Sequence, residues 1–359
     1  MHLRENDMKH ELTHGGDWAG FLSNRGYLPL DYSSNISPLG VPPGVQEALR
    51  KTAAKADRYP DPLCRELRKA LSRKESIPEE QILCGNGAAD LIFRAVLARR
   101  PRRALVTAPT FAEYETALDT VGCVVEHAML KVEDGFALGK GFLSAITPET
   151  DMVFLCEPNN PTGVTTAPAL LTQILKRCRE TGTMLVVDEC FSDFLDAPED
   201  HTREGDLAKF PNLLLLKAFT KLYAMAGVRL GYVLCADTDF LERMRQMGQP
   251  WAVSSLAQAA GVAALRETDY VRQVRELTMT ERAWLIQQLA GLGLRVIPGE
   301  ANYLLFQSPR PLSEPLEQQG ILLRNCGNYV GLDDTWYRIA VRTRTDNQWL
   351  IEALGEVLR

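Results

Sequence analysis

The sequence predicts an α/β fold, in which a mostly parallel sheet is covered by helices and followed by a smaller α+β domain. Two observations support this class. From about residue 75 to 235, short apolar runs alternate with longer amphipathic stretches, as expected for strands and helices around a parallel sheet. After about residue 290 the pattern changes to that of a small unit with strands at 294–307 and 336–342 and a final helix at 346–359.

The elements of the larger unit follow in order. A short strand is predicted at 81–84, followed by a helix that begins after the glycines of "GNGAAD" (85–90). Gly182 is expected to end an amphipathic helix at 167–182, and the stretch 239–290 is helical in pattern. Six apolar runs are predicted to be strands buried on both faces: 104–109, 123–130, 152–158, 184–189, 212–219 and 230–236.

Composition excludes several classes of protein. The net charge of -6 argues against a nucleic-acid or anionic-membrane partner, and the longest apolar runs, such as "LLLL", are too short to cross a bilayer. The eight cysteines never form a C-x-x-C pair and most lie in apolar runs, which favours reduced, packed thiols and a cytoplasmic protein.

The N-terminal stretch "KHELTHGGDW" contains His10, Glu11 and His14 at the spacing used by zinc metalloproteases. Two glycines, Gly15 and Gly16, would end any helix that carried this pair, and no other histidine lies in a convincing position for a third ligand. We therefore interpret the match as accidental and expect no metal.

Three strand ends and one lysine are candidates for chemistry. The glycines of "GNGAAD" could bind an anion at a helix N-terminus or simply make a turn, and the Asn residues of "CEPNNPTG" (156–163) could face a ligand or a turn. Asp188 ends an apolar strand, where it could also cap a helix. Lys221 follows another strand and has Arg229 nearby; it is either a solvated lysine or one whose pKa is lowered, as a Schiff-base lysine requires.

The order and spacing of these stretches resemble the fold-type-I aminotransferase superfamily, from about residue 30 to the C-terminus. The specific marks are "YPDP" (59–62), "PNNPTG" (158–163), "VDE" (187–189) and "TKLYAMAGVRLGY" (220–232). The resemblance implies pyridoxal 5′-phosphate (PLP) as cofactor. Lys221 would bind it covalently and move protons, and Asp188 would pair with the pyridine nitrogen and keep it protonated.

The same resemblance implies the remaining cofactor contacts and a homodimer. Asn160 would donate to O3′ of the ring, Phe111 would stack on its face, and Tyr59 would reach the phosphate from a second subunit. The other cofactor-binding residues would be Gly87, Ala88, Ala89, Thr220 and Arg229. Ala218 and Phe191 depart from the usual Ser and Tyr of the superfamily, which weakens one phosphate contact and leaves Asn160 as the main donor to O3′.

Further resemblance to the histidinol-phosphate aminotransferase branch implies a small phosphorylated substrate. Arg338 would clamp the substrate carboxylate, although an exposed salt-bridged arginine is the alternative, and Arg324 would bind the substrate phosphate. Arg342 shares the face of Arg338 and either adds charge near the substrate or pairs with an acid.

Within this branch, a subgroup of decarboxylases fits better, through "HGGDW" (14–18), "DYSSNISPLG" (31–40), Phe191 and "CGNYVGLDD" (326–334). The resemblance to this subgroup implies an N-terminal arm that lies over the substrate. The residues that would contact the substrate are His14, Gly15, Gly16 and Asn35. Decarboxylation, transamination and a non-catalytic PLP-fold regulator remain open, and Lys221 argues against the last. We expect an arm at 1–45, a large PLP-binding domain at 46–245, a connecting helix at 246–285 and a small domain at 286–359.

Overall fold

The computed structural model describes residues 14–359, in which a seven-stranded sheet forms the centre of the larger lobe. Strand β8 is antiparallel to both of its neighbours, β2 and β7, and all other neighbours are parallel. The mostly parallel sheet predicted from the sequence is therefore confirmed. In sheet order the strands are β2 (Ile82–Gly85), β8 (Gly231–Cys235), β7 (Leu213–Ala218), β6 (Met184–Asp188), β5 (Met152–Cys156), β3 (Arg103–Ala108) and β4 (Val124–Met129).

One predicted strand is less buried than expected. The sequence predicts that the run 123–130 is covered on both faces, but β4 lies at the end of the strand order and pairs only with β3. Val124 and Met129 are 53% and 52% exposed. Apolar composition alone does not tell an edge strand from a central one, because both favour β-branched residues.

Helices cover both faces of this sheet, and alternate strand residues enter two separate hydrophobic cores. Leu185 packs on the side of α7, whereas Val186 packs on the side of α4. Helix α7 ends at Gly182, which has the left-handed φ of 73° expected of a glycine cap. The helices of this lobe are α3 (Arg65–Glu75), α4 (Gly87–Arg99), α5 (Glu113–Asp119), α6 (Phe142–Ala145), α7 (Pro168–Thr181), α8 (Pro198–His201) and α9 (Thr238–Gln246).

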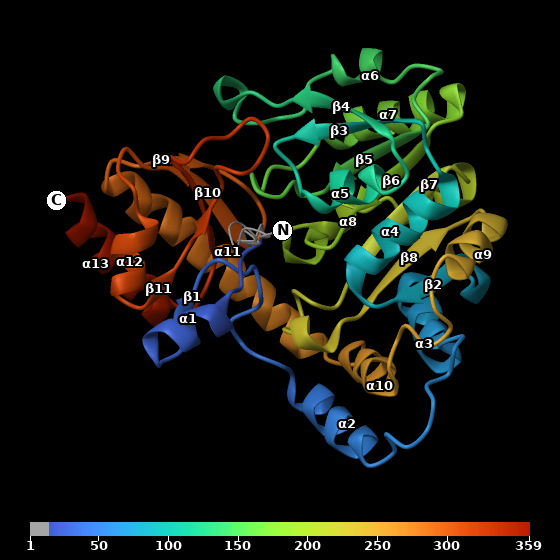
Figure 1. The fold of residues 1–359 in the computed structure, drawn as a ribbon, viewed down its shortest axis with the longest axis horizontal. Helices are drawn as coiled ribbons and strands as arrows, with labels where there is room; N and C mark the ends of the chain where they lie inside the picture. Colours follow the sequence, from blue (N-terminus) through green and yellow to red (C-terminus); the bar gives the residue numbers. More distant parts are fainter. Residues whose placement is uncertain (1–13) are drawn as a thin grey trace, which may run out of the picture.

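The smaller lobe contains an antiparallel sheet in the order β12 (Arg324–Asn325), β13 (Trp336–Ala340), β10 (Tyr303–Gln307) and β9 (Arg295–Ile297). Beside it, β1 (Leu30–Asp31) from the N-terminal part pairs in parallel with β11 (Ile321–Leu322). Figure 1 shows the two lobes side by side, with α1 and β1 against the smaller one and α2 lying near α10. The remaining helices are α1 (Trp18–Arg25), α2 (Pro43–Ala53), α10 (Ser255–Ala264), α11 (Thr268–Gly291), α12 (Ser313–Gln318) and α13 (Arg344–Leu358).

The loop that follows β5 joins the two lobes. Gly163 in this loop and Gly299 before β10 approach so closely that a Cβ on Gly163 would lie 3.2 Å from the Cα of Gly299. The N–H of Glu300 donates to the carbonyl of Gly163 at 2.7 Å, and the hydroxyl of Tyr303 donates to the carbonyl of Asn159 at 3.0 Å. Backbone therefore packs directly on backbone at this seam. The domain boundaries at residues 45, 245 and 285 stay a prediction.

Two absences hold for residues 14–359. No helix in this range is long and apolar enough to cross a membrane. No group of three or more metal-ligating side chains comes together there either, and His10 and Glu11 lie outside the described residues. All eight cysteines are free thiols.

Candidate active site

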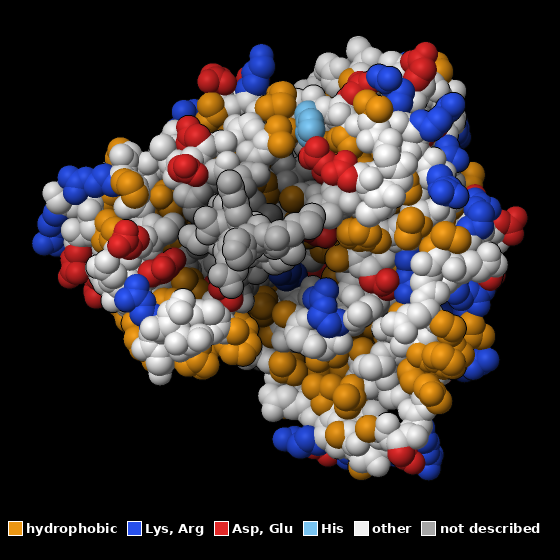
Figure 2. Space-filling model, in the orientation of Figure 1, with side chains coloured by type: hydrophobic (Ala, Val, Ile, Leu, Met, Phe, Trp, Pro, Cys, Tyr) orange, Lys and Arg blue, Asp and Glu red, His pale blue; other side chains and the backbone are white. Residues whose placement is uncertain are grey.

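A cavity of about 210 Å³ lies where the carboxyl ends of β6 and β7 face the smaller lobe. Figure 2 shows the face of the molecule on which the two lobes meet. The cavity brings together most of the predicted cofactor residues: Ala88, Ala89, Phe111, Asn160, Asp188, Thr220, Lys221 and Arg229. It also brings together most of the predicted substrate residues: His14, Gly15, Asn35, Arg324 and Arg338.

Lys221 lies in the wall of this cavity, three residues after the end of β7. Burial is the largest cause that lowers its pKa, and the positive charges of Arg338 and Arg229 lower it further, to about 8 from an ordinary 10.5. Its Nζ lies 5.9 Å from the centre of the Phe191 ring. The interpretation of Lys221 as a solvated surface lysine is therefore wrong, and the site favours a reactive amine.

Asp188 is buried at the tip of β6 and faces the same cavity. The hydroxyl of Tyr114 donates to its Oδ2 at 2.7 Å, and the N–H of Cys190 donates to its Oδ1 at 3.0 Å. Burial raises the pKa of this carboxyl, and the two hydrogen bonds oppose the rise. The contact with Cys190 is a local turn contact and not a helix cap, since the next α-helix begins only at Pro198.

The N-terminus of α4 lies at the cavity beside Arg229, and we refer to these groups as the anion cradle after the role predicted for them. Gly87 has a φ of +83°, and a Cβ added there would come within 2.7 Å of Nη2 of Arg229. Backbone N–H groups at a helix N-terminus together with a guanidinium are the groups that bind a phosphate. Gly87 does not itself line the cavity, whereas Ala88 and Ala89 do.

Arg338 and Arg324 line the cavity from the smaller lobe, as direct neighbours across β13 and β12. The guanidinium of Arg338 is buried and donates to Oδ1 of Asn160 and to the carbonyl of Ser33, without an acidic partner in hydrogen-bond reach among residues 14–359. The alternative of an exposed, salt-bridged Arg338 is therefore wrong. Because Asn160 accepts from Arg338 through its oxygen, its NH₂ group is the part left to donate to a ligand.

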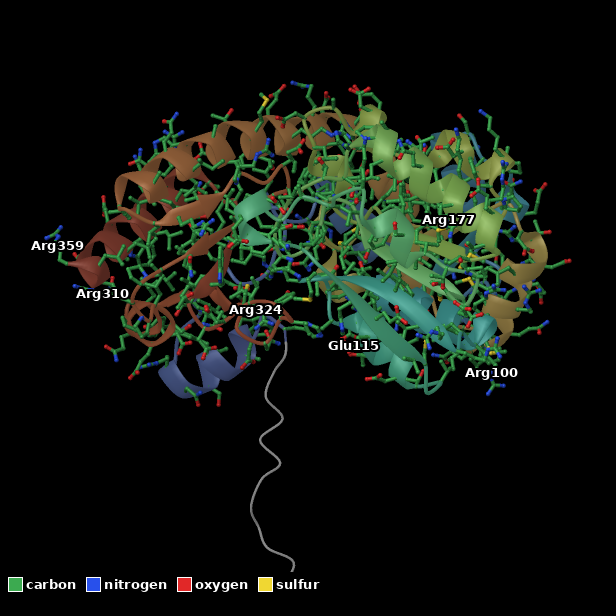
Figure 3. All side chains as sticks on the ribbon, turned by 90° about the horizontal axis from the view of Figure 1, so that it is seen from above. Arg100, Glu115, Arg177, Arg310, Arg324 and Arg359 are labelled. Carbon is green, nitrogen blue, oxygen red and sulfur yellow. The ribbon has the colours of Figure 1, made fainter. Side chains whose placement is uncertain are left out.

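Arg324 donates to Oδ1 of Asn328 at 2.7 Å and lies over the ring of Tyr329. Figure 3 shows Arg324 on the inner side of the smaller lobe, toward the lobe that carries Glu115. Arg342 behaves differently: it pairs with Asp346 at 3.1 Å, which is the second of the two roles considered for it.

Three predicted residues lie beside the cavity or away from it. Gly87, described above, is the first of them. Gly16 is the second: it lies next to the cavity wall and donates its N–H to Oγ of Ser33 at 2.7 Å. Tyr59 is 81% exposed and stacks on Trp251, with ring centres 4.8 Å apart. In a single chain, Tyr59 therefore takes no part in the cavity.

Several residues at the site were not predicted from the sequence. Glu113 approaches His14, with Oε1 and Nε2 2.8 Å apart, although the two residues lie 99 positions apart in the chain. Ser33 and Tyr114 support Arg338 and Asp188. Tyr114 and Glu113 belong to the stretch "PTFAEY" (109–114), but nothing in the sequence assigns their partners.

A second cavity, of about 740 Å³, is larger than the first. It lies on the other face of the sheet, beside a group of carboxylates. Its wall includes Lys217, which is 8% exposed and pairs with Glu75 at 3.4 Å and with Glu189 and Glu204. These carboxylates strongly raise the pKa of Lys217 despite its burial. Lys217 and these carboxylates are already paired with each other, and neither Lys221 nor Asp188 nor Arg229 lines this second cavity.

Comparison with known proteins identifies the family of the chain. The chain matches the model of the family "Aminotransferase class I and II" over residues 29–354. It is similar to a threonine-phosphate decarboxylase of Salmonella typhimurium, with 39% identity over 353 residues that cover 96% of each chain. It is also similar to a histidinol-phosphate aminotransferase of Moorella thermoacetica, with 33% identity over 92% of this chain and 85% of that one.

A solved structure agrees with this placement. The L-threonine-O-3-phosphate decarboxylase of Porphyromonas gingivalis has a TM-score of 0.82 and 26% identity, over 92% of this chain and 99% of that one. The fold and the site thus define a PLP-dependent enzyme of fold type I. The chain belongs to the class I and II aminotransferase family.

The residues present fit PLP. The cavity offers an amine of lowered pKa, a buried carboxylate on a neighbouring strand and an anion cradle that a Cβ at Gly87 would crowd. These three features match the aldehyde, the pyridine nitrogen and the phosphate of the cofactor. When bound, PLP supplies an electron sink for the bond that breaks at the substrate Cα.

Proposed function

We propose that this protein is a homodimeric, PLP-dependent decarboxylase that acts on L-threonine O-3-phosphate, or on its close analogue serine phosphate, and that it converts threonine phosphate to 1-amino-2-propanol phosphate, a step of cobalamin biosynthesis. The observation that carries the proposal is the pair of neighbouring arginines, Arg324 and Arg338, which the smaller lobe contributes to the cavity that Lys221 also lines. A substrate with two separate anionic groups, a carboxylate and a phosphate, fits two adjacent guanidinium groups. The greater identity to the Salmonella decarboxylase supports this choice.

Each residue has a defined task in this reaction. Arg338 binds the substrate carboxylate and Arg324 its phosphate, so that the Cα lies against Lys221. Asp188 holds a proton on the pyridine nitrogen through its charge. The bond between Cα and the carboxylate breaks, CO₂ leaves, and the ammonium of Lys221 returns a proton to Cα. A lysine with a pKa of about 8 can give and take a proton near neutral pH.

The homodimer is part of the proposal because of two exposed aromatic side chains. Tyr59 and Trp251, 81% and 45% exposed, stack on each other at the surface. Large aromatic side chains are enriched at protein interfaces, and a partner that covered this pair could receive the Tyr59 hydroxyl at its own phosphate cradle.

A histidinol-phosphate-type aminotransferase is the second candidate, favoured by the similarity to the Moorella protein. The same lysine would then remove the Cα proton, and the carboxylate would stay. The two reactions differ only in which bond of Cα the arginines and the arm turn toward the cofactor, so their residue sets are nearly the same.

One assay separates the two reactions. The PLP-loaded enzyme is incubated with threonine phosphate and, separately, with histidinol phosphate plus 2-oxoglutarate. CO₂ release that needs no 2-oxoglutarate supports the decarboxylase, whereas glutamate formation without CO₂ rejects it. Lys221→Ala serves as the control and should abolish either reaction; full activity in this variant would also overturn the role of Lys221 and admit a non-catalytic role for the cofactor site.

A further inference from the structure

The N-terminal arm reaches the cavity through His14 and Gly15, and two hydrogen bonds hold residues 14–16 in place. Nε2 of His14 lies 2.8 Å from Oε1 of Glu113, the first residue of α5. The N–H of Gly16 donates to Oγ of Ser33 at 2.7 Å. His14 and Gly15 thereby form part of the cavity wall.

We infer that Glu113 is a positioning residue: it holds the imidazole of His14 at the mouth of the cavity and so keeps the arm closed over the substrate. The inference rests on the proposed function, because it assigns the arm a part in binding the phosphorylated substrate. Glu113 does not line the cavity and acts only through His14.

The position of Glu113 suits this role because its neighbours are tied to the site. Phe111, two residues earlier, lines the cavity and lies 5.8 Å from the His14 ring, measured between ring centres. Tyr114, the next residue, is fully buried and donates to Asp188. The Glu113 carboxylate, which contacts His14, therefore belongs to a backbone segment whose neighbouring residues are held at the cofactor end of the site.

The strength of the contact fits an arm that opens and closes. The side chains of His14 and Glu113 are 46% and 20% exposed, so water competes for both groups. A hydrogen bond in such surroundings is worth about a two- to tenfold change in an equilibrium. This is enough to bias the arm toward the closed position and too little to lock it.

Ser33 links the closed arm to the arginine that is proposed to bind the substrate carboxylate. Its Oγ accepts from Gly16 and donates to Asp31, and its carbonyl accepts from Nη2 of Arg338 at 2.7 Å. A Cβ on Gly15 would come within 2.3 Å of that same carbonyl oxygen, so the arm lies directly on Ser33. Ser33 thus both docks the arm and supports the Arg338 guanidinium. Release of His14 should therefore weaken substrate binding.

The chain provides a matched control for Glu113. Glu115, on the same helix, makes a second His–Glu contact, with Oε2 3.2 Å from Nε2 of His127, and neither residue lines the active-site cavity. A general effect of removing a carboxylate from α5 would appear equally in Glu115→Ala.

The test compares Glu113→Ala, Glu113→Gln and Glu115→Ala in the PLP-loaded enzyme, with steady-state kinetics on threonine phosphate. We expect Glu113→Ala to raise KM about two- to tenfold with a smaller change in kcat, because the arm binds substrate rather than moving protons. Glu113→Gln keeps an oxygen that accepts from His14 and should restore most of the affinity, and Glu115→Ala should behave as wild type. An unchanged KM in Glu113→Ala, or an equal rise in Glu115→Ala, overturns the inference.

Hydrogen exchange measured by mass spectrometry gives an independent readout without substrate. The amide of Gly16 should exchange faster in Glu113→Ala than in wild type or Glu115→Ala, because its hydrogen bond to Ser33 opens more often. Equal exchange in all three proteins contradicts the inference. If wild type releases no CO₂, the proposed function fails, while the exchange rates still decide whether Glu113 holds the arm.

Discussion

The lowered pKa of Lys221 predicts how fast the apoprotein takes up PLP at different pH values. Only the neutral amine can bond to the PLP aldehyde. With a pKa of about 8, roughly one Lys221 in ten is neutral at pH 7, against about one in 3,000 for a lysine at 10.5, a difference of about 300-fold. The uptake rate should therefore rise about tenfold per pH unit below 8 and level off above it.

Arg338→Leu tests the cause of this shift. Arg338 is the strongest of the charges that lower the pKa of Lys221, but burial is the larger cause and remains in the variant. We therefore expect uptake at pH 7 to slow about tenfold, and not by the full 300-fold, with the midpoint of the pH profile moved upward. Arg342→Leu is the control, since Arg342 pairs with Asp346 outside the cavity.

The assay is stopped-flow absorbance of apoprotein mixed with PLP between pH 6 and 10. A wild-type midpoint near 10, or a profile that Arg338→Leu leaves unchanged, would refute the explanation that burial and neighbouring arginines lower the pKa of Lys221. A loss of uptake shared by Arg342→Leu would point to general damage to the fold.

Three further variants test other parts of the structure. Gly87→Ala forces a methyl group to within 2.7 Å of Arg229 at a φ of +83°, and should weaken PLP binding about tenfold in an equilibrium titration; unchanged affinity would show that the cradle does not hold the phosphate. Tyr114→Phe removes the hydroxyl that donates to buried Asp188, and should lower the free energy of unfolding by about 1–3 kcal/mol in urea, with the pKa of the carboxyl rising further. Lys217→Met leaves its carboxylate partners without their cation and should cost about 3–5 kcal/mol at pH 8. Burial already raises the folded-state pKa of two of these carboxyls, Glu75 and Glu189, so they take up protons as the pH falls, and the loss should be smaller at pH 5.5; a constant loss would contradict this.

The architecture could be predicted because it depends on patterns that repeat along the chain. Apolar runs of strand length alternating with amphipathic helices specify a parallel sheet, and the carboxyl ends of parallel strands meet at one edge. Asp188 and Lys221, placed at two such ends, are therefore expected to lie near each other, and both line one cavity.

The rest depends on which side chains meet across long separations, and no local pattern encodes that. The contact of His14 with Glu113 joins an arm to a helix, and the Lys217 cluster collects side chains from four separate segments. The exposed position of β4 follows from strand order, which apolar composition does not specify. The exposed position of Tyr59, stacked on Trp251, likewise follows from a contact that the sequence does not specify.

The contact between Gly163 and Gly299 has a mechanical consequence. The two backbones touch with no side chain between them, and the N–H of Glu300 bonds to the carbonyl of Gly163 at the same place. A side chain larger than hydrogen at Gly163 would push the loop after β5 away from the smaller lobe. Because Asn160 in this loop accepts a hydrogen bond from Arg338, such a change would also disturb the spacing between groups of the two lobes at the cavity.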